Sequence, residues 1–222
     1  MYAETNDHYV IRPMRFFDVD KVVNVHMESF QGFFLTFLGR QVLKLYYEGI
    51  LQDSSGIGFS CVNRDDIIGF VVGFHNPSGF YSRLLKRDLV RFGFACIPAV
   101  LKKPKTFLRL LRAIVKPFEA PSGKAAELSS IAVLPHYQRR GIGRQLINAF
   151  IKEATDRDIE YVYLTTDALN NEAAITLYNM LGFKLYRKYE TSEKRLMCEY
   201  RYVINKTAAD DRNSFKAKQS DL

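Results

Sequence analysis

The sequence predicts an α+β protein in which helices flank a mixed, mostly antiparallel central sheet. Apolar residues make up 47% of the 222 residues and include 17 Phe and 13 Tyr, enough for a sizeable core. Segments with helical spacing of apolar residues alternate with short apolar runs typical of strands. One such run, at residues 126–133, continues through a basic, glycine-rich turn into an amphipathic helix.

The predicted elements follow the order β-α-α-β-β, an insertion, and then β-α-β-α-β-β. Asp18 is a candidate N-cap for the first helix, because its short carboxylate can accept from a free backbone N–H. Before the insertion we expect a strand at Tyr9–Pro13, helices at residues 19–30 and 42–50 joined by an aromatic linker at 31–39, and a hairpin of residues 57–62 and 67–74. After it we expect strands at residues 126–133, 159–165, 183–189 and 195–204, and helices at 141–157 and 172–181.

The insertion, at about residues 76–123, is strongly basic. Ten basic residues lie between Arg83 and Lys116 against the single acid Asp88, so this segment accounts for the net charge of +8. Helical patches are expected at residues 82–92 and 106–115, with breaks at the prolines of the insertion, namely Pro98, Pro104 and Pro117. A solvated face, a membrane-surface helix, a lid over an anionic substrate and a docking surface are all consistent with this composition.

The remaining composition narrows the class of protein. Three widely spaced cysteines without a Cys/His cluster indicate reduced thiols rather than disulfides or a metal site. The N-terminus has no basic, apolar signal pattern, so we expect a cytoplasmic protein, with attachment to the inner face of the membrane as an alternative. We expect one domain over residues 9–204 and a disordered polar tail at 205–222.

The glycine-rich turn has the chemistry of an anion site. Gly141 and Gly143 leave the backbone N–H groups at a helix start open to a ligand, and that helix end carries the positive pole of the dipole. Arg139, Arg140 and Arg144 add positive charge to the same turn. A pyrophosphate-bearing ligand fits these features.

Two ordered motifs resemble the GCN5-related N-acetyltransferase (GNAT) superfamily. The first is Gln138-x-x-Gly141-x-Gly143 after a strand that ends Ile-Ala-Val, and the second is Asn171-x-x-Ala-x-x-Leu-Tyr178-x-x-x-Gly182-Phe183. The resemblance covers about residues 9–204 and implies the GNAT-like fold, acetyl-CoA as cosubstrate and no metal. It assigns acetyl-CoA binding to Ile131, Ala132, Val133, Gln138, Arg139, Arg140, Gly141, Ile142, Gly143, Arg144 and Asn171, with the Val133 N–H as a candidate oxyanion donor.

The resemblance also suggests catalytic roles for Tyr178 and Glu127. A phenol is protonated at neutral pH, so Tyr178 can donate a proton to a departing thiolate; a core aromatic is the alternative. Glu127 is a candidate general base whose apolar surroundings would raise its pKa, and a solvent-facing strand-edge carboxylate is equally consistent. His26 is expected to be a satisfied core histidine, and Asp167 to cap the following helix rather than orient the acceptor.

The acceptor is the least determined part of the prediction. By the resemblance, Phe33 and Phe34 are candidate substrate-binding residues, and packing in the core is the alternative. We expect direct transfer of acetyl to a primary amine on a small molecule or nucleotide-linked amino sugar. A protein N-terminus or lysine, and a non-catalytic acyl-CoA-binding or membrane-docking module, remain alternatives. Contact of the basic insertion with an anionic membrane or surface and formation of a homodimer are further alternatives, and no binding of nucleic acid is expected.

Overall fold

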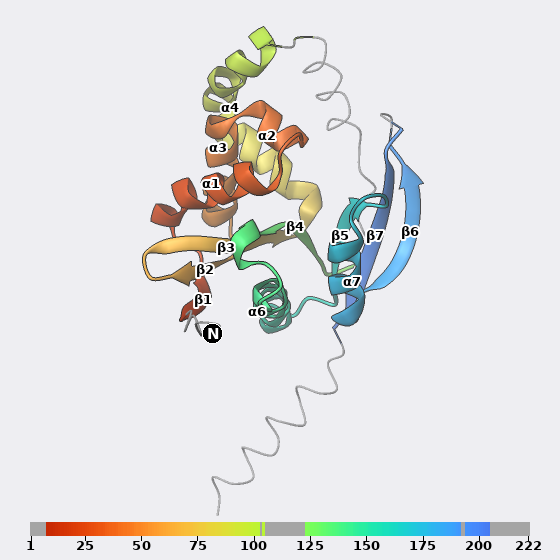
Figure 1. Ribbon diagram of the computed structural model, residues 1–222. Helices are drawn as coiled ribbons and strands as arrows, with labels where there is room; N and C mark the ends of the chain where they lie inside the picture. The colour runs from red at the N-terminus through yellow and green to blue at the C-terminus, as the bar shows by residue number, and fades with distance from the viewer. Residues whose placement is uncertain (1–7, 103, 105–122, 192–193, 205–222) are drawn as a thin grey trace, which may run out of the picture.

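A seven-stranded sheet forms the centre of the protein in the computed structural model, which describes residues 8–102, 104, 123–191 and 194–204 (Figure 1). Neighbouring strands are antiparallel except for β4 and β5, which confirms the predicted fold class. The strand order is β1-β2-β3-β4-β5-β7-β6. The strands are β1 (Tyr9–Pro13), β2 (Gly56–Asn63), β3 (Asp66–His75), β4 (Ala125–Val133), β5 (Tyr161–Asp167), β6 (Lys184–Glu190) and β7 (Leu196–Val203).

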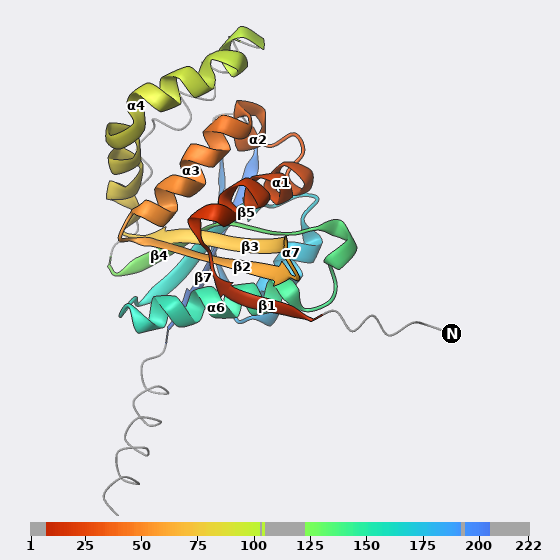
Figure 2. The ribbon, with the colours of Figure 1, turned by 90° about the vertical axis from the view of Figure 1, so that its left-hand side faces the viewer.

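Helices cover both faces of the sheet (Figures 1 and 2). The helices α1 to α4 lie on one face, and α6 and α7 lie on the other. They are α1 (Val19–Ser29), α2 (Phe34–Leu38), α3 (Arg40–Gln52), α4 (Pro77–Lys102), α6 (Ile142–Asp156) and α7 (Glu172–Met180), with short 3-10 turns η1 (Phe16–Asp18) and η2 (Pro135–Tyr137).

The periodicity of α6 explains how this helix attaches to the sheet. Leu146, Ile147 and Phe150 recur at helical spacing and are fully buried against β2, β3 and β4. Truncating a buried phenylalanine such as Phe150 to alanine typically costs about 3–5 kcal/mol. The apolar stripe of α6 therefore fixes the position of its N-terminus next to the end of β4.

The sheet opens between its two parallel strands. β4 and β5 pair only from Ala125 to Glu127, and within the described residues the rest of β4 has β3 as its single strand partner. A β-bulge at Ser129 shifts the alternation of β4, so that Leu128 and Ile131 both contact the α6 side. Beyond Glu127 and Tyr163 the facing edges of β4 and β5 have no strand partner among the described residues, which leaves an opening between them.

Four local expectations were wrong. The segment predicted as a linker contains α2, and Asp18 makes no side-chain cap; its buried carboxylate instead accepts bonds from Arg12 and from the backbone N–H of Arg15. α4 continues through Pro98, whose exposed position lets water satisfy the carbonyl that loses its partner. The break lies at Asp88 instead, where φ is −121° and ψ is 24°. The predicted helix at residues 106–115 and the tail at 205–222 lie outside the described residues.

Candidate functional site

The free edge of β4 presents backbone groups to the opening in the sheet. Leu134 N donates a bond of 2.9 Å to Ile68 O on β3, whereas the carbonyl of Val133 accepts 3.0 Å from Nε2 of Gln138. Because backbone groups alternate in direction along a strand, Val133 and Ile131 face the opening and Ala132 faces β3. Of the three residues predicted to pair with an acyl-CoA arm, Val133 therefore directs its N–H into the opening and Ile131 directs both its N–H and its carbonyl there, while the carbonyl of Val133 is bonded to Gln138.

The N-terminus of α6 lies directly after this edge. Gly141 is the N-cap residue, with φ of 80°, and it provides no side-chain cap. The first intrahelical bond runs from Gln145 N to Gly141 O, so the N–H groups of Ile142, Gly143 and Arg144 lie outside the intrahelical ladder. The geometry required for an anion cradle at this turn is present.

The glycines of the turn serve different purposes. At Gly141 an added Cβ would meet open space, but the left-handed backbone disfavours any L side chain. At Gly143 an added Cβ would lie 3.2 Å from Cδ2 of Leu177. Gly141 therefore allows the turn to form, and Gly143 allows α6 and α7 to approach closely.

The arginines of the turn also differ. Arg139 and Arg144 are exposed, as a phosphate ligand would require. Arg140 lies over the ring of Tyr137 at 5.2 Å and donates to His136 O, and its own carbonyl accepts from the hydroxyl of Tyr9. Arg140 thus stabilises the turn itself.

Helix α7 places the two residues of the second motif. Asn171 is the N-cap residue, and its amide nitrogen donates to Oγ1 of Thr166 instead of capping the helix. Tyr178 is buried, with its ring centroid 5.9 Å from Phe183 and 6.2 Å from Tyr200. Burial raises the pKa of Tyr178 to about 12, and the described residues provide no hydrogen-bond partner for its hydroxyl. Tyr178 therefore packs in the core, and its protonated hydroxyl can still act as a proton donor.

Glu127 lies where β4 and β5 separate. Its carboxylate accepts a bond of 2.8 Å from the hydroxyl of Tyr163, its direct neighbour on β5. Burial raises the pKa of Glu127 to about 6, with a further contribution from the charge of Glu199, while the bond from Tyr163 opposes the shift. The predicted direction of the pKa shift is confirmed, and Glu127 is a partly buried carboxylate rather than a solvent-facing one.

Hydroxyl groups surround Glu127 in a way that sequence analysis missed. The hydroxyl of Tyr46 on α3 lies 2.5 Å from Oγ of Ser129, and Tyr81 on α4 also bonds Ser129 and interacts with Glu127. Burial raises the pKa of Tyr189 on β6, and the charge of Glu127 contributes to this rise. These residues are far apart in the sequence, so no local pattern could have brought them together.

The predicted substrate residue Phe33 lies near the end of β5. It is exposed, and the guanidinium of Arg195 lies 5.9 Å from its ring centroid. Arg195 also donates to both carboxylate oxygens of Asp167, which was expected to cap α7 and instead forms this ion pair. The side chain of Phe34 lies outside the described part of the structure.

His26 is a core residue but is not fully satisfied. Its Nδ1 lies 2.6 Å from the hydroxyl of Tyr47, whereas its buried Nε2 has no partner. Burial lowers the pKa of His26 to about 4, so the ring is neutral at physiological pH.

Comparison with known proteins agrees with this geometry. A profile described as "Acetyltransferase (GNAT) family" matches residues 19–183. This chain belongs to that family. The match runs from the start of α1 to Phe183, so the GNAT region includes Glu127, the glycine-rich turn, Asn171 and Tyr178. The resemblance stated from the two motifs is confirmed.

Curated relatives of this GNAT chain match over short segments. The [ribosomal protein bS18]-alanine N-acetyltransferase of Escherichia coli K12 is 47% identical over 58 residues, which is 26% of this chain and 38% of that protein. The mycothiol acetyltransferase of Paenarthrobacter aurescens is 39% identical over 69 residues, 31% of this chain and 21% of that protein.

Solved structures extend the similarity in fold to most of the chain. Arabidopsis thaliana NAA60 with a bisubstrate analogue has a TM-score of 0.59 at 18% identity, covering 89% of this chain and 100% of that one. The ribosomal-protein-S18-alanine N-acetyltransferase of Escherichia coli has a TM-score of 0.57 at 18% identity, covering 89% of this chain and 95% of that one.

Proposed function

We propose that the protein transfers an acetyl group from acetyl-CoA to a primary amine. The observation that carries this proposal is the free edge of β4, where Val133 and Ile131 direct backbone groups into the opening beside the N-terminus of α6. A pantetheine arm has amides that can pair with such an edge, and its pyrophosphate suits the N–H groups that follow Gly141. Arg139 and Arg144 supply exposed positive charge for the phosphates.

The residues around the opening suggest how the reaction proceeds. Glu127 would accept a proton from the incoming ammonium, directly or through water, and the amine nitrogen would then attack the thioester carbonyl. The Val133 N–H would donate to the oxyanion of the tetrahedral intermediate. When this intermediate collapses, the carbon–sulfur bond would break and Tyr178 would donate its proton to the departing thiolate. The second proton released by the new amide nitrogen would then restore the phenol.

A small, hydroxyl-bearing amine such as an amino sugar is the proposed acceptor. The hydroxyls of Tyr46, Tyr81 and Ser129 gather beside Glu127, where they can hydrogen-bond a polyhydroxylated ligand next to a carboxylate that attracts its amine. The contact of Arg195 with Phe33 joins the α1–α2 segment to the residue before β7.

A protein N-terminus is the second candidate acceptor. The relative from Escherichia coli is named for alanine acetylation of a ribosomal protein, and a 44% identical segment of 62 residues matches an N-alpha-acetyltransferase of Sulfurisphaera tokodaii. This similarity lies in less than a third of the chain, 26% and 28% respectively.

A thiol-release assay with acetyl-CoA tests both candidates. The amine panel should contain nucleotide-linked amino sugars, free amino sugars, and peptides with N-terminal alanine or internal lysine. We expect turnover with a sugar amine, and Tyr46→Phe and Tyr81→Phe should raise its KM. Turnover with peptides alone would reject the amino sugar and indicate a protein amine as the acceptor. Binding of acetyl-CoA without turnover on any amine would indicate a non-catalytic module.

A further inference from the structure

Helix α4 exposes an unusual amount of apolar surface. Six large apolar side chains on this helix are between 45% and 77% exposed, namely Leu85, Leu89, Val90, Phe94, Ile97 and Leu101. After the break at Asp88, Val90, Phe94, Ile97 and Leu101 follow one another at intervals of four, three and four residues, so they share one side of the helix.

The opposite side of α4 is also apolar. Phe92, Ala95, Cys96 and Ala99 pack with Leu38 of α2 and Val42 of α3. After Asp88, helix α4 therefore has apolar residues on its inner and on its outer side, and a helix of this kind is normally covered on both sides. The outer side of α4 is nevertheless exposed, and an exposed apolar surface of this kind indicates an interaction site.

The charge of α4 is mainly positive. Helix α4 carries five basic residues and one acid, Asp88, whose carboxylate already pairs with Arg87 and Arg91. Lys86 and Lys102, near opposite ends of the exposed side, form no ion pair with any residue that the structure describes. A second copy of the chain would bring these like charges together, whereas an anionic surface would neutralise them.

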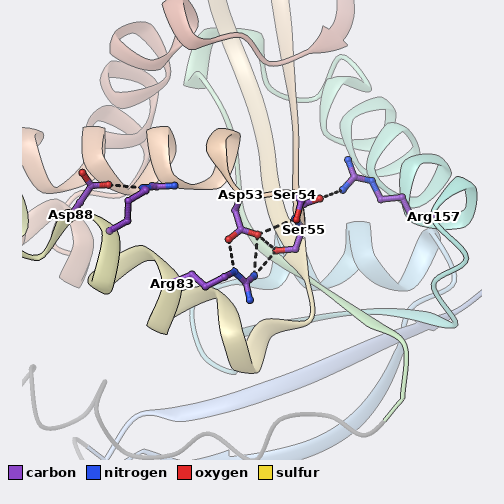
Figure 3. A network of polar contacts seen from close by, with 7 residues as sticks. Asp53, Ser54, Ser55, Arg83, Asp88 and Arg157 are labelled. Carbon is purple, nitrogen blue, oxygen red and sulfur yellow. Dashed lines mark hydrogen bonds and ion pairs between the residues drawn. The ribbon is translucent and has the colours of Figure 1, made fainter.

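The base of α4 is held firmly to the rest of the protein. Arg83 donates bonds of 2.7 and 2.9 Å to the carboxylate of Asp53, which also accepts from Ser55 (Figure 3). Phe80 and Leu84 are buried beside this network. From this anchor the helix extends past α2 and α3 to the outer end of the molecule (Figure 2).

We propose that the outer side of α4 docks onto an anionic lipid bilayer. The exposed apolar side chains would enter the boundary between headgroups and acyl chains, and Lys86 and Lys102 would bind lipid phosphates. Within the described residues no helix is long and apolar enough to cross a membrane, so α4 would lie along the surface. Tyr81, which belongs to the proposed acceptor site, lies near the start of the same helix.

Vesicle co-sedimentation of the full chain tests this proposal independently of acetyl transfer. We expect binding to vesicles of phosphatidylcholine mixed with phosphatidylglycerol, weaker binding at high salt, and little binding to phosphatidylcholine alone. The double variant Phe94→Ser/Leu101→Ser should lower partitioning by about tenfold or more. Lys86→Ala/Lys102→Ala should lower it about fivefold for each charge removed at low ionic strength.

Matched controls come from exposed residues on the sheet. Val10→Ser/Val203→Ser removes apolar groups of similar exposure, and Lys184→Ala/Lys188→Ala removes the same charge; both should bind as wild type does. Far-ultraviolet circular dichroism should show that all variants are folded. The proposal is overturned by wild-type protein that stays in solution with anionic vesicles, or by an α4 variant that binds normally. A wild-type dimer in light scattering that Phe94→Ser/Leu101→Ser converts to monomer would also overturn it.

Discussion

The hydroxyl of Tyr163 donates a hydrogen bond of 2.8 Å to Oε2 of Glu127 at the last position where β4 and β5 pair. The bond fixes the carboxylate at the point where the sheet opens and limits the rise in its pKa. Glu127 therefore changes charge near pH 6, within the range in which an amine acetyltransferase can be assayed.

Glu127→Gln should abolish most turnover and at the same time stabilise the fold above pH 6. A carboxyl pKa raised from 4.5 to about 6 contributes stability below the unfolded pKa, and this contribution is lost as pH rises through the folded pKa. The neutral amide avoids that loss, so above pH 6 the variant should gain at most about 2 kcal/mol in its free energy of unfolding relative to wild type. Chemical denaturation of both proteins at pH 5 and pH 8 measures it; equal differences at both pH values would contradict the assignment.

Tyr163→Phe should move the acid limb of the pH–rate profile to higher pH. The substitution removes the donor that favours the ionised form of Glu127, so the pKa of Glu127 should rise further. The matched control is Tyr186→Phe, an exposed tyrosine on β6 that does not bond Glu127. An unchanged acid limb in Tyr163→Phe would show that Glu127 is not the group that controls the rate.

Tyr178→Phe should slow turnover by about a hundredfold while leaving acetyl-CoA affinity unchanged, because the hydroxyl is needed as the thiolate departs. Since burial raises the pKa of Tyr178 to about 12, wild type should keep its rate through the mildly alkaline range. Tyr200→Phe is the control, since this buried tyrosine lies 6.2 Å away in the same cluster. Equal turnover in Tyr178→Phe and wild type would exclude Tyr178 as the acid.

Gly141→Ala should destabilise the protein by about 1–2 kcal/mol and weaken acetyl-CoA binding. The φ of 80° at this position is strained for an alanine, although the space around it is open. Gly141→Asn should be milder, because asparagine tolerates the left-handed region better. Thermal unfolding and isothermal titration with CoA compare the two variants; an alanine variant as stable as the asparagine variant would argue against backbone strain.

Asp53→Asn should loosen the start of α4 and lower the free energy of unfolding by about 1 kcal/mol at neutral pH. The Arg83 guanidinium holds the pKa of Asp53 well below its usual range, so its contribution is present above the unfolded pKa and lost as pH falls towards the folded value. Hydrogen exchange of residues 77–90 should increase. Asp156→Asn breaks the exposed pair with Lys152 and should change stability by less than about 0.5 kcal/mol.

Local sequence determined the strand, turn and helix that we propose bind the donor. The apolar run of β4, the glycines at the start of α6 and the apolar stripe of α6 lie within about thirty consecutive residues, so periodicity and glycine placement predicted them directly. The identity of the two motifs then indicated the family. The strand pairing that frees the β4 edge agrees with that prediction, because the parallel β4–β5 ladder ends at Glu127.

Only the tertiary structure decided what surrounds Glu127 and where the helix of the insertion packs. Tyr46 and Ser129 are 83 positions apart, and they meet because α3 packs over the sheet face on which the bulge of β4 turns Ser129. The helix through Pro98 likewise depends on packing against α2 and α3, which outweighs the local preference of proline for a break. Contacts between distant segments leave no periodic pattern in the sequence, which is why the strand, turn and helix proposed for the donor could be predicted and the hydroxyl groups around Glu127 could not.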